Sequence, residues 1–172
     1  MMHIREERPE DAEGIRAVND AAFGGEDESA LIERLRDDDL MIASLVAEEY
    51  GEIVAHIAFS ELEVTSNDHK RSIRAASLAP MAVAPTHQRL GIGSELVRQG
   101  LEKCREKGVE AVVVVGHERF YPRFGFSAEI AECLKCPFSA PFFMVLALKQ
   151  GVFDDFSGFV IYPDAFGLGD AK

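Results

Sequence analysis

The sequence has 172 residues, no tryptophan, three cysteines and no long apolar run. An odd number of cysteines in a chain of this size does not indicate a disulfide framework, so Cys104, Cys133 and Cys136 are expected to be free thiols. A membrane-spanning helix needs about 20 consecutive apolar residues. The N-terminus also lacks the basic start and apolar run of a secretory signal. We therefore expect a cytoplasmic protein that does not bind a membrane.

Basic residues are scarce compared with acidic ones. The chain has 18 lysines and arginines against 30 aspartates and glutamates, which gives a net charge of -12. Nucleic-acid binding requires clustered cations that neutralise phosphates, so no nucleic-acid partner is expected. The acidity is typical of a solvated surface, and it would also attract cationic molecules such as amines.

The length and composition bound the fold. A chain of 172 residues with 47% hydrophobic and 28% charged residues has the size and balance of one globular domain. No linker, internal repeat or low-complexity segment divides it. We predict a single α/β domain over residues 1–172.

Apolar periodicity predicts alternating strands and helices. Strands are predicted at 3–7, 41–49, 53–64, 73–84, 111–115 and 142–149, with a further strand in the apolar tail 151–172. Helices are predicted at 9–23, 29–35, 92–107 and, as a short helix, 117–124. The succession of strand, helix and buried strand between 73 and 115 indicates a parallel crossover connection.

Two glycines lie where the helix at 92–107 begins. The unpaired N–H groups and the positive dipole end of a helix N-terminus favour a bound phosphate. Gly91 and Gly93 would let the main chain approach the anion, and Arg89 would add a positive charge. The segment lacks the third glycine of a dinucleotide fingerprint and the Gly-Lys-Ser/Thr of an NTPase loop. It therefore indicates a phosphate or pyrophosphate site without naming the ligand.

This loop and its surroundings resemble the GNAT superfamily of N-acetyltransferases. Residues 88–93, Gln-Arg-Leu-Gly-Ile-Gly, match the family motif Arg/Gln-x-x-Gly-x-Gly/Ala. Residues 121–126, Tyr-Pro-Arg-Phe-Gly-Phe, are similar to the family's Tyr-x-x-x-Gly-Phe, and residues 8–11 resemble its first strand-helix junction. The resemblance covers a core at 2–148, with an extension at 149–172 that we expect to pack on it.

The resemblance implies a mixed, splayed sheet flanked by helices, with acetyl-CoA as the cosubstrate. The pyrophosphate would lie on the glycine loop and the pantetheine arm along a strand edge. The implied acceptor is a primary amine of a small molecule or a protein, no metal is needed, and a homodimer is compatible with the family. The implied cofactor-binding residues are Met81, Ala82, Val83, Gln88, Arg89, Leu90, Gly91, Ile92, Gly93 and Ser94.

One residue is expected to act in catalysis. The tyrosine of the second family motif often protonates the departing thiolate, so the resemblance gives this role to Tyr121. The alternative is an aromatic wall packed beside Phe120 and Phe124. The family's Asn-x-x-Ala stretch before this tyrosine is absent. The base that accepts the amine proton stays open, and water could serve. The candidate side chains are Glu28, Glu61, Glu63, His56, His117 and Glu118.

Other functions fit parts of the same sequence. The glycine loop alone fits a nucleotide-binding protein, which would bind ATP or NAD. The same fold also fits a noncatalytic acyl-CoA-binding regulatory module, which would bind CoA without acetyl transfer. The pair Cys133 and Cys136 has the spacing of half a zinc or redox site, but a second pair is missing. Ordinary buried thiols are the simpler interpretation of these cysteines.

Overall fold

The computed structural model describes residues 1–138 and 141–168, and the chain divides into two compact units. Unit 1 consists of Met1–Ser60 and Ala79–Cys104, and unit 2 consists of Glu61–Leu78 and Arg105–Lys172. Two long neighbouring strands, β3 (Glu52–Ser66) and β4 (Ser72–Val83), contribute to both units. Each unit is therefore discontinuous along the sequence.

Within the described residues, three α-helices and six further strands accompany β3 and β4. The helices are α1 (Ala12–Phe23), α2 (Asp27–Asp37) and α3 (Ile92–Glu106). The other strands are β1 (Met2–Glu6), β2 (Met41–Glu49), β5 (Ala111–Val115), β6 (Leu134–Lys135), β7 (Phe143–Ala147) and β8 (Gly158–Ile161).

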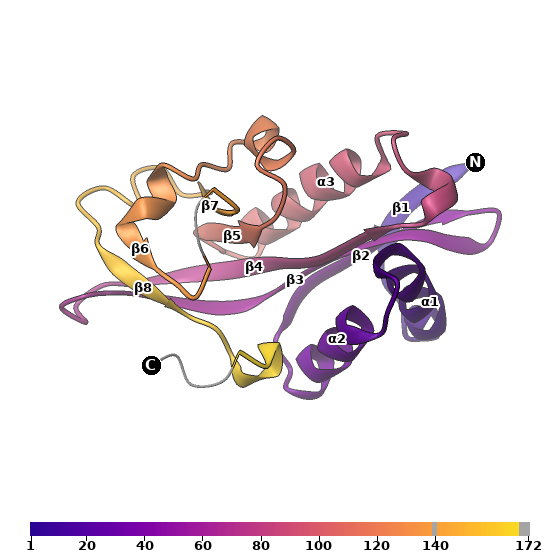
Figure 1. Ribbon diagram of the computed structural model, residues 1–172, viewed down its shortest axis with the longest axis horizontal. Helices are drawn as coiled ribbons and strands as arrows, with labels where there is room; N and C mark the ends of the chain where they lie inside the picture. The colour runs from indigo at the N-terminus through magenta and orange to yellow at the C-terminus, as the bar shows by residue number, and fades with distance from the viewer. Residues whose placement is uncertain (139–140, 169–172) are drawn as a thin grey trace. The chain divides into compact units, whose positions relative to one another are not determined.

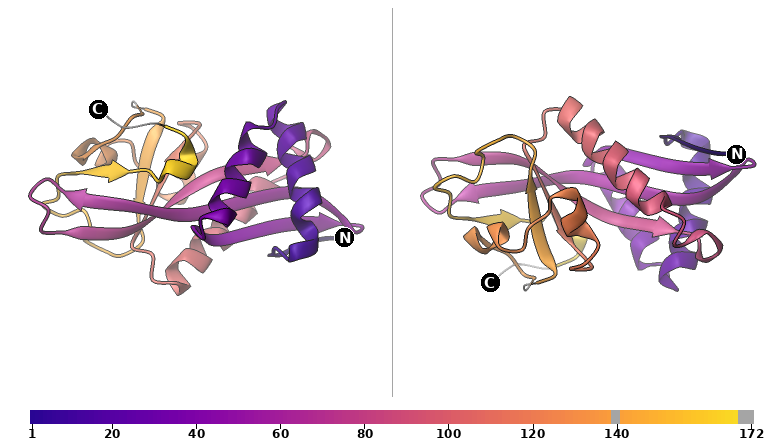
Figure 2. Two further views of the ribbon diagram at one scale, coloured as in Figure 1. Left: turned by 90° about the horizontal axis from the view of Figure 1, so that it is seen from below. Right: turned by 90° about the horizontal axis from the view of Figure 1, so that it is seen from above.

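Unit 1 has helices on both faces of its strands. β1 pairs antiparallel with β2, and β2 pairs antiparallel with β3. α1 and α2 cover one face, where Ile15, Ile32 and Val46 form a buried cluster, and α3 lies on the opposite face (Figures 1 and 2). On the α3 face, Gly100 lies so close to the ring of Phe59 that a Cβ would be 2.2 Å from Cε2. Alternation along the strands thus supplies apolar side chains to both helical layers.

Helix α3 forms because its apolar residues recur at helical spacing. Beyond its last turn, Gly108 has a left-handed φ of 81°, and its N–H donates to the carbonyl of Arg105 at 3.0 Å. Glycine is the residue that adopts this conformation at a helix C-terminus without strain. The buried side chains that define the apolar face are Ile92, Leu96, Val97, Leu101 and Cys104.

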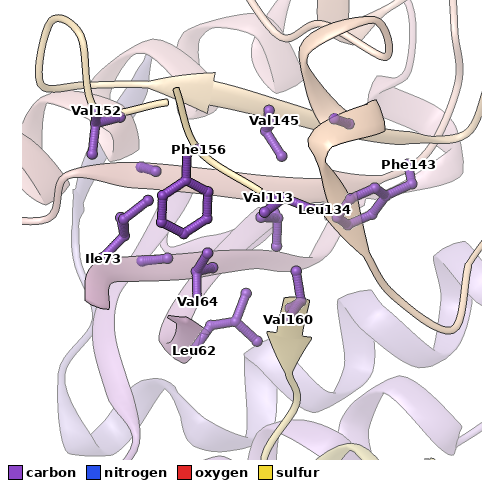
Figure 3. Packing of buried hydrophobic residues seen from close by; sticks show 13 residues of the cluster. Leu62, Val64, Ile73, Val113, Leu134, Phe143, Val145, Val152, Phe156 and Val160 are labelled. Atoms are coloured by element: carbon purple, nitrogen blue, oxygen red, sulfur yellow. The ribbon is translucent and has the colours of Figure 1, made fainter. Parts of the chain in front are cut away.

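Unit 2 has an apolar core built from strands of mixed direction. β4 pairs parallel with β5, β5 pairs antiparallel with β7, and β8 pairs antiparallel with β3 and parallel with β6. Figure 3 shows the buried cluster of 13 residues, in which Phe156 lies beside side chains from several strands. The members of this cluster that Figure 3 labels are Leu62, Val64, Ile73, Val113, Leu134, Phe143, Val145, Val152, Phe156 and Val160.

The mixed α/β fold and the parallel connection β4–α3–β5 are confirmed. The predicted strands at 41–49 and 111–115 have the predicted bounds, whereas the segment 29–35 is part of the longer helix α2. The predicted helix at 117–124 is wrong in extent, because only Tyr121–Phe124 forms a 3-10 turn, which ends at Gly125 with φ of 101°. Strand β6 was not predicted. The end of the predicted tail, 169–172, lies outside the described residues.

Candidate functional site

The candidate cofactor loop joins β4 to α3 in unit 1. Pro85–His87 form a 3-10 turn, Arg89 and Gly91 then have φ of 65° and 85°, and α3 begins at Ile92. Left-handed residues in such a turn direct successive backbone N–H groups toward one point, which is how anion-binding nests are built. The positive end of the α3 dipole lies at the same place. The loop therefore has a backbone geometry suited to phosphate oxygens.

The two glycines of the loop differ in their backbone conformation and in their surroundings. A Cβ at Gly91 would have no atom within 4 Å, so the positive φ, not space, requires glycine there. A Cβ at Gly93 would lie 3.5 Å from Met81 Cε and 3.7 Å from Val83 Cγ2. The first turn of α3 is thus packed against the end of β4, so that residues predicted to hold two parts of the cofactor are neighbours.

The loop side chains differ in what they contact. Nε2 of Gln88 donates a hydrogen bond to the Val83 carbonyl at 3.1 Å, so this side chain ties the loop to β4. Arg89 is exposed and Leu90 is 68% exposed, whereas Ile92 is buried in the α3 packing face. Sequence reasoning placed the loop but did not foresee the partner of Gln88.

Tyr121 lies in the turn after β5 in unit 2. The side chain is 7% exposed, and its ring packs edge-to-face on Phe120 and Phe126 at centroid distances of 5.0 and 5.7 Å. A Cβ at Gly116 would lie 2.4 Å from Tyr121 Cε2, so glycine leaves the space that the ring occupies. Burial raises the pKa of the Tyr121 phenol to about 12, because desolvation disfavours the phenolate. The phenol is therefore protonated at neutral pH, as a proton donor must be.

His56 is excluded as the base because it is fully buried in unit 1. Its Nδ1 lies 3.2 Å from Asn19 Nδ2, and its Nε2 lies 2.8 Å from Ser44 Oγ. Asn19 Nδ2 also donates to the Ile15 carbonyl at 2.9 Å. Since an amide nitrogen only donates, Nδ1 is the acceptor and Nε2 carries the proton. Burial lowers the pKa of His56 to about 3, and nearby Arg36 adds to this effect. His56 is a neutral structural histidine.

The structure does not single out one of the other candidates as the base that accepts the amine proton. In unit 2, Glu61 forms an ion pair with Arg74 at 2.9 Å, and Glu63 accepts a hydrogen bond from Thr65 at 3.1 Å. The remaining candidates are at least partly exposed: Glu28, His117 and Glu118.

The cysteines are free thiols. Burial raises the thiol pKa of Cys133 and Cys136, which disfavours the thiolate needed for metal or redox chemistry. Over residues 1–138 and 141–168, no group of three or more His, Cys, Asp or Glu side chains could hold a metal ion.

None of the described helices combines the length and apolarity needed to cross a bilayer.

Sequence reasoning missed His87, which precedes the motif. Its Nε2 lies 3.1 Å from Glu49 Oε1, and its Nδ1 lies 2.8 Å from Thr86 Oγ1. In the sequence, the signal that could have pointed to His87 was its position directly before Gln88. The partner Glu49 is 38 residues away along the chain, so local sequence could not reveal it.

Comparisons with known protein sequences agree with the motifs. The model of the acetyltransferase (GNAT) domain matches residues 3–128. The uncharacterized N-acetyltransferase YhbS of Escherichia coli (strain K12) is 33% identical over 168 residues, which cover 96% of this chain and 98% of YhbS. The uncharacterized N-acetyltransferase YjhQ of the same strain is 39% identical over 118 residues, which cover 67% of this chain and 64% of YjhQ.

Solved structures of relatives have a similar fold, and two of them contain bound ligands. The E. coli YhbS crystal structure in complex with CoA has a TM-score of 0.88 at 30% identity, covering 98% of this chain and 93% of that one. A GNAT acetyltransferase from Brucella melitensis in complex with acetyl-CoA has a TM-score of 0.78 at 36% identity, covering 96% of this chain and 98% of that one. Together with the glycine loop at the start of α3, these matches show that the chain belongs to the GNAT family of N-acetyltransferases.

Proposed function

We propose that this chain transfers the acetyl group of acetyl-CoA directly to a primary amine of a small molecule or a protein. The observation that carries the proposal is the loop from Gln88 to Ser94, whose left-handed Arg89 and Gly91 precede the N-terminus of α3. Two relatives that are 30% and 36% identical were crystallised with CoA and acetyl-CoA, which supports the same cosubstrate here.

The cofactor would bind through main-chain groups at the end of β4 and the start of α3. In this proposal, the pyrophosphate accepts hydrogen bonds from the loop N–H groups, and the pantetheine arm pairs with the Met81–Val83 edge. Met81 and Val83 are partly exposed, whereas Ala82 between them is buried. A backbone N–H of Met81 or Val83 would polarise the thioester carbonyl as an oxyanion donor does.

The chemical step is an aminolysis of a thioester. The lone pair of the neutral amine attacks the carbonyl carbon, the C–S bond breaks, and an amide and a CoA thiolate result. The Tyr121 phenol donates a proton to the thiolate, and water or a side chain accepts the proton that the amine loses. With its pKa raised to about 12, the Tyr121 phenol carries its proton at neutral pH. Its buried, ring-packed position supports a fixed donor.

Ligand-induced stabilisation tests the cofactor first. We expect acetyl-CoA and CoA to raise the thermal midpoint, since a ligand at 100 times its Kd stabilises the native state by about 2.7 kcal/mol. ATP and NAD serve as controls for a nucleotide-binding protein that uses the glycine loop alone. No shift with millimolar acetyl-CoA or CoA would contradict the proposal.

Thiol release from acetyl-CoA across a panel of amines then tests the transfer. CoA binding without release for any amine would support the noncatalytic acyl-CoA-binding module instead. With an amine that reacts, Tyr121→Phe keeps the packed ring and removes the proton donor, so we expect kcat to fall about 100-fold or more while CoA affinity stays the same. Tyr162→Phe is the matched control, because Tyr162 is also a ring-packed, partly buried tyrosine of unit 2. Equal kcat for Tyr121→Phe and the unsubstituted protein would make Tyr121 a packing residue only.

A further inference from the structure

A short chain of hydrogen bonds lies directly before the cofactor loop. His87 is partly buried, whereas the flanking residues from Pro85 to Gly91 are exposed. Its Nε2 lies 3.1 Å from Glu49 Oε1 at the end of β2, and its Nδ1 lies 2.8 Å from Thr86 Oγ1. All three residues belong to unit 1.

The Glu49 carboxylate fixes the direction of the first hydrogen bond, and for a neutral imidazole this also fixes the direction of the second. An ionised carboxylate only accepts, so the Nε2–H of His87 donates to Glu49. In the neutral imidazole the other nitrogen is then an acceptor, and the hydroxyl of Thr86 donates to Nδ1. Each polar atom of the His87 ring therefore has a partner of the correct kind.

The backbone beyond His87 needs such a support. Arg89 has a φ of 65°, a left-handed conformation that is unfavourable for a residue with a side chain, and Gly91 follows with φ of 85°. Strained backbone of this kind persists only where surrounding contacts fix it. On the N-terminal side of the loop, the N–H of Ala84 donates to the Val54 carbonyl at 2.8 Å, and the N–H of His87 donates to the Ala84 carbonyl at 2.8 Å.

We propose that Thr86, His87 and Glu49 form a clamp that holds the cofactor loop in the conformation that binds pyrophosphate. His87 and Glu49 are then positioning residues, which act on CoA affinity through the loop backbone without contacting the reacting atoms. Gln88 adds a second support through its hydrogen bond to the Val83 carbonyl. This inference rests on the proposed binding of CoA at the loop.

Calorimetric titration of the full chain with CoA tests the clamp. His87→Ala and Glu49→Ala are each expected to weaken CoA binding about fivefold to tenfold, the loss that one or two hydrogen bonds convert to. Glu49→Gln keeps an oxygen that accepts from Nε2–H, so its affinity should stay within about twofold of the unsubstituted chain. Glu52→Ala is the matched control, because exposed Glu52 lies directly opposite Glu49 in the β2–β3 hairpin.

A double variant separates a clamp from two unrelated effects. If His87 and Glu49 act through one hydrogen bond, His87→Ala with Glu49→Ala should bind CoA about as weakly as either single variant. Multiplied losses in the double variant would overturn the clamp.

Two further results would also overturn it. One is an unchanged CoA affinity in both alanine variants, even if their thermal midpoints fall, because that is the signature of a structural role alone. The other is equal weakening by Glu49→Gln and Glu49→Ala, which would assign the effect to charge. Failure of the unsubstituted chain to bind CoA is a separate result that would overturn the proposed function itself.

Discussion

A buried network of polar side chains in unit 1 contrasts with a buried apolar cluster in unit 2. Unit 1 buries the chain of hydrogen bonds from the Ile15 carbonyl through Asn19 and His56 to Ser44. The cluster at the centre of unit 2 consists of apolar side chains alone (Figure 3). Buried polar groups are stable only when they are paired in the correct direction, whereas apolar cores depend on volume and shape.

The same difference applies to the two segments that the proposed function uses. In unit 1, the cofactor loop is fixed by directional hydrogen bonds from Gln88 and His87. In unit 2, the ring of Tyr121 packs against Phe120 and fills the space beside Gly116 that a side chain would otherwise occupy. Hydrogen bonds orient a strained backbone, and aromatic packing excludes water around a donor. Substitutions should therefore disturb the two units in different ways.

Removing a ring from the core of unit 2 should have the largest effect. Phe156 is 4% exposed and lies in the apolar cluster, so Phe156→Ala is expected to lower the free energy of unfolding by about 3–5 kcal/mol. Chemical denaturation measures this change. Phe142→Ala in the same unit is the control, because Phe142 is 50% exposed and should lose little. Similar losses for both variants would mean that the cluster does not dominate the stability of unit 2.

Acid should test the polar interior of unit 1. The pKa of His56 is about 3 in the folded state against 6.5 for an ordinary histidine, so the unfolded chain binds the proton more readily. The stabilising contribution is complete above pH 6.5 and is lost as the pH falls from 6.5 toward 3. Between pH 7 and 5 we expect a loss of about 2 kcal/mol.

Denaturation at several pH values measures this loss, and two variants assign it. His56→Gln cannot take up the proton and should flatten the profile above pH 5, although it is less stable overall. His3→Ala removes an exposed histidine of the same unit and should leave the profile unchanged. A profile with the same slope in His56→Gln would exclude His56 as its source.

The smallest effect concerns the α3 face of unit 1. Gly100→Ala would place a Cβ 2.2 Å from the ring of fully buried Phe59. We expect overpacking to lower the free energy of unfolding by about 1–2 kcal/mol, after the better helix propensity of alanine is included. Gly25→Ala is the control, because a Cβ there has no neighbour within 4 Å. A stabilised Gly100→Ala would show that this face of unit 1 has room to adjust.

Local patterns were sufficient for much of the fold. The apolar run of β5 and the helical spacing of α3 are properties of contiguous residues, and both elements were predicted with their connection. Strand β6 has two residues and depends on pairing with β8, a partner that no local pattern identifies. The segment before Tyr121 contains too few apolar residues at helical spacing to form more than a 3-10 turn.

The candidate site was predictable to the same degree. The glycine motif placed the loop from Gln88 to Ser94, because the left-handed backbone at Gly91 favours glycine at that position. The roles of His56 and His87 could not be predicted, since each is set by partners on other elements. A histidine in sequence is equally compatible with a base, a buried structural group or a support for a loop.

The discontinuity of the two units has a consequence for synthesis of the chain. The ribosome makes Met1–Ser60 of unit 1, then Glu61–Leu78 of unit 2, and then Ala79–Cys104, which completes unit 1. Unit 2 cannot fold completely until its second segment, Arg105–Lys172, has been synthesised. During translation, the part of the β3–β4 hairpin that belongs to unit 1 therefore has its partners before the part that belongs to unit 2. Until the last third of the chain has been made, the nascent chain exposes apolar strand segments of unit 2 that have no partner strands.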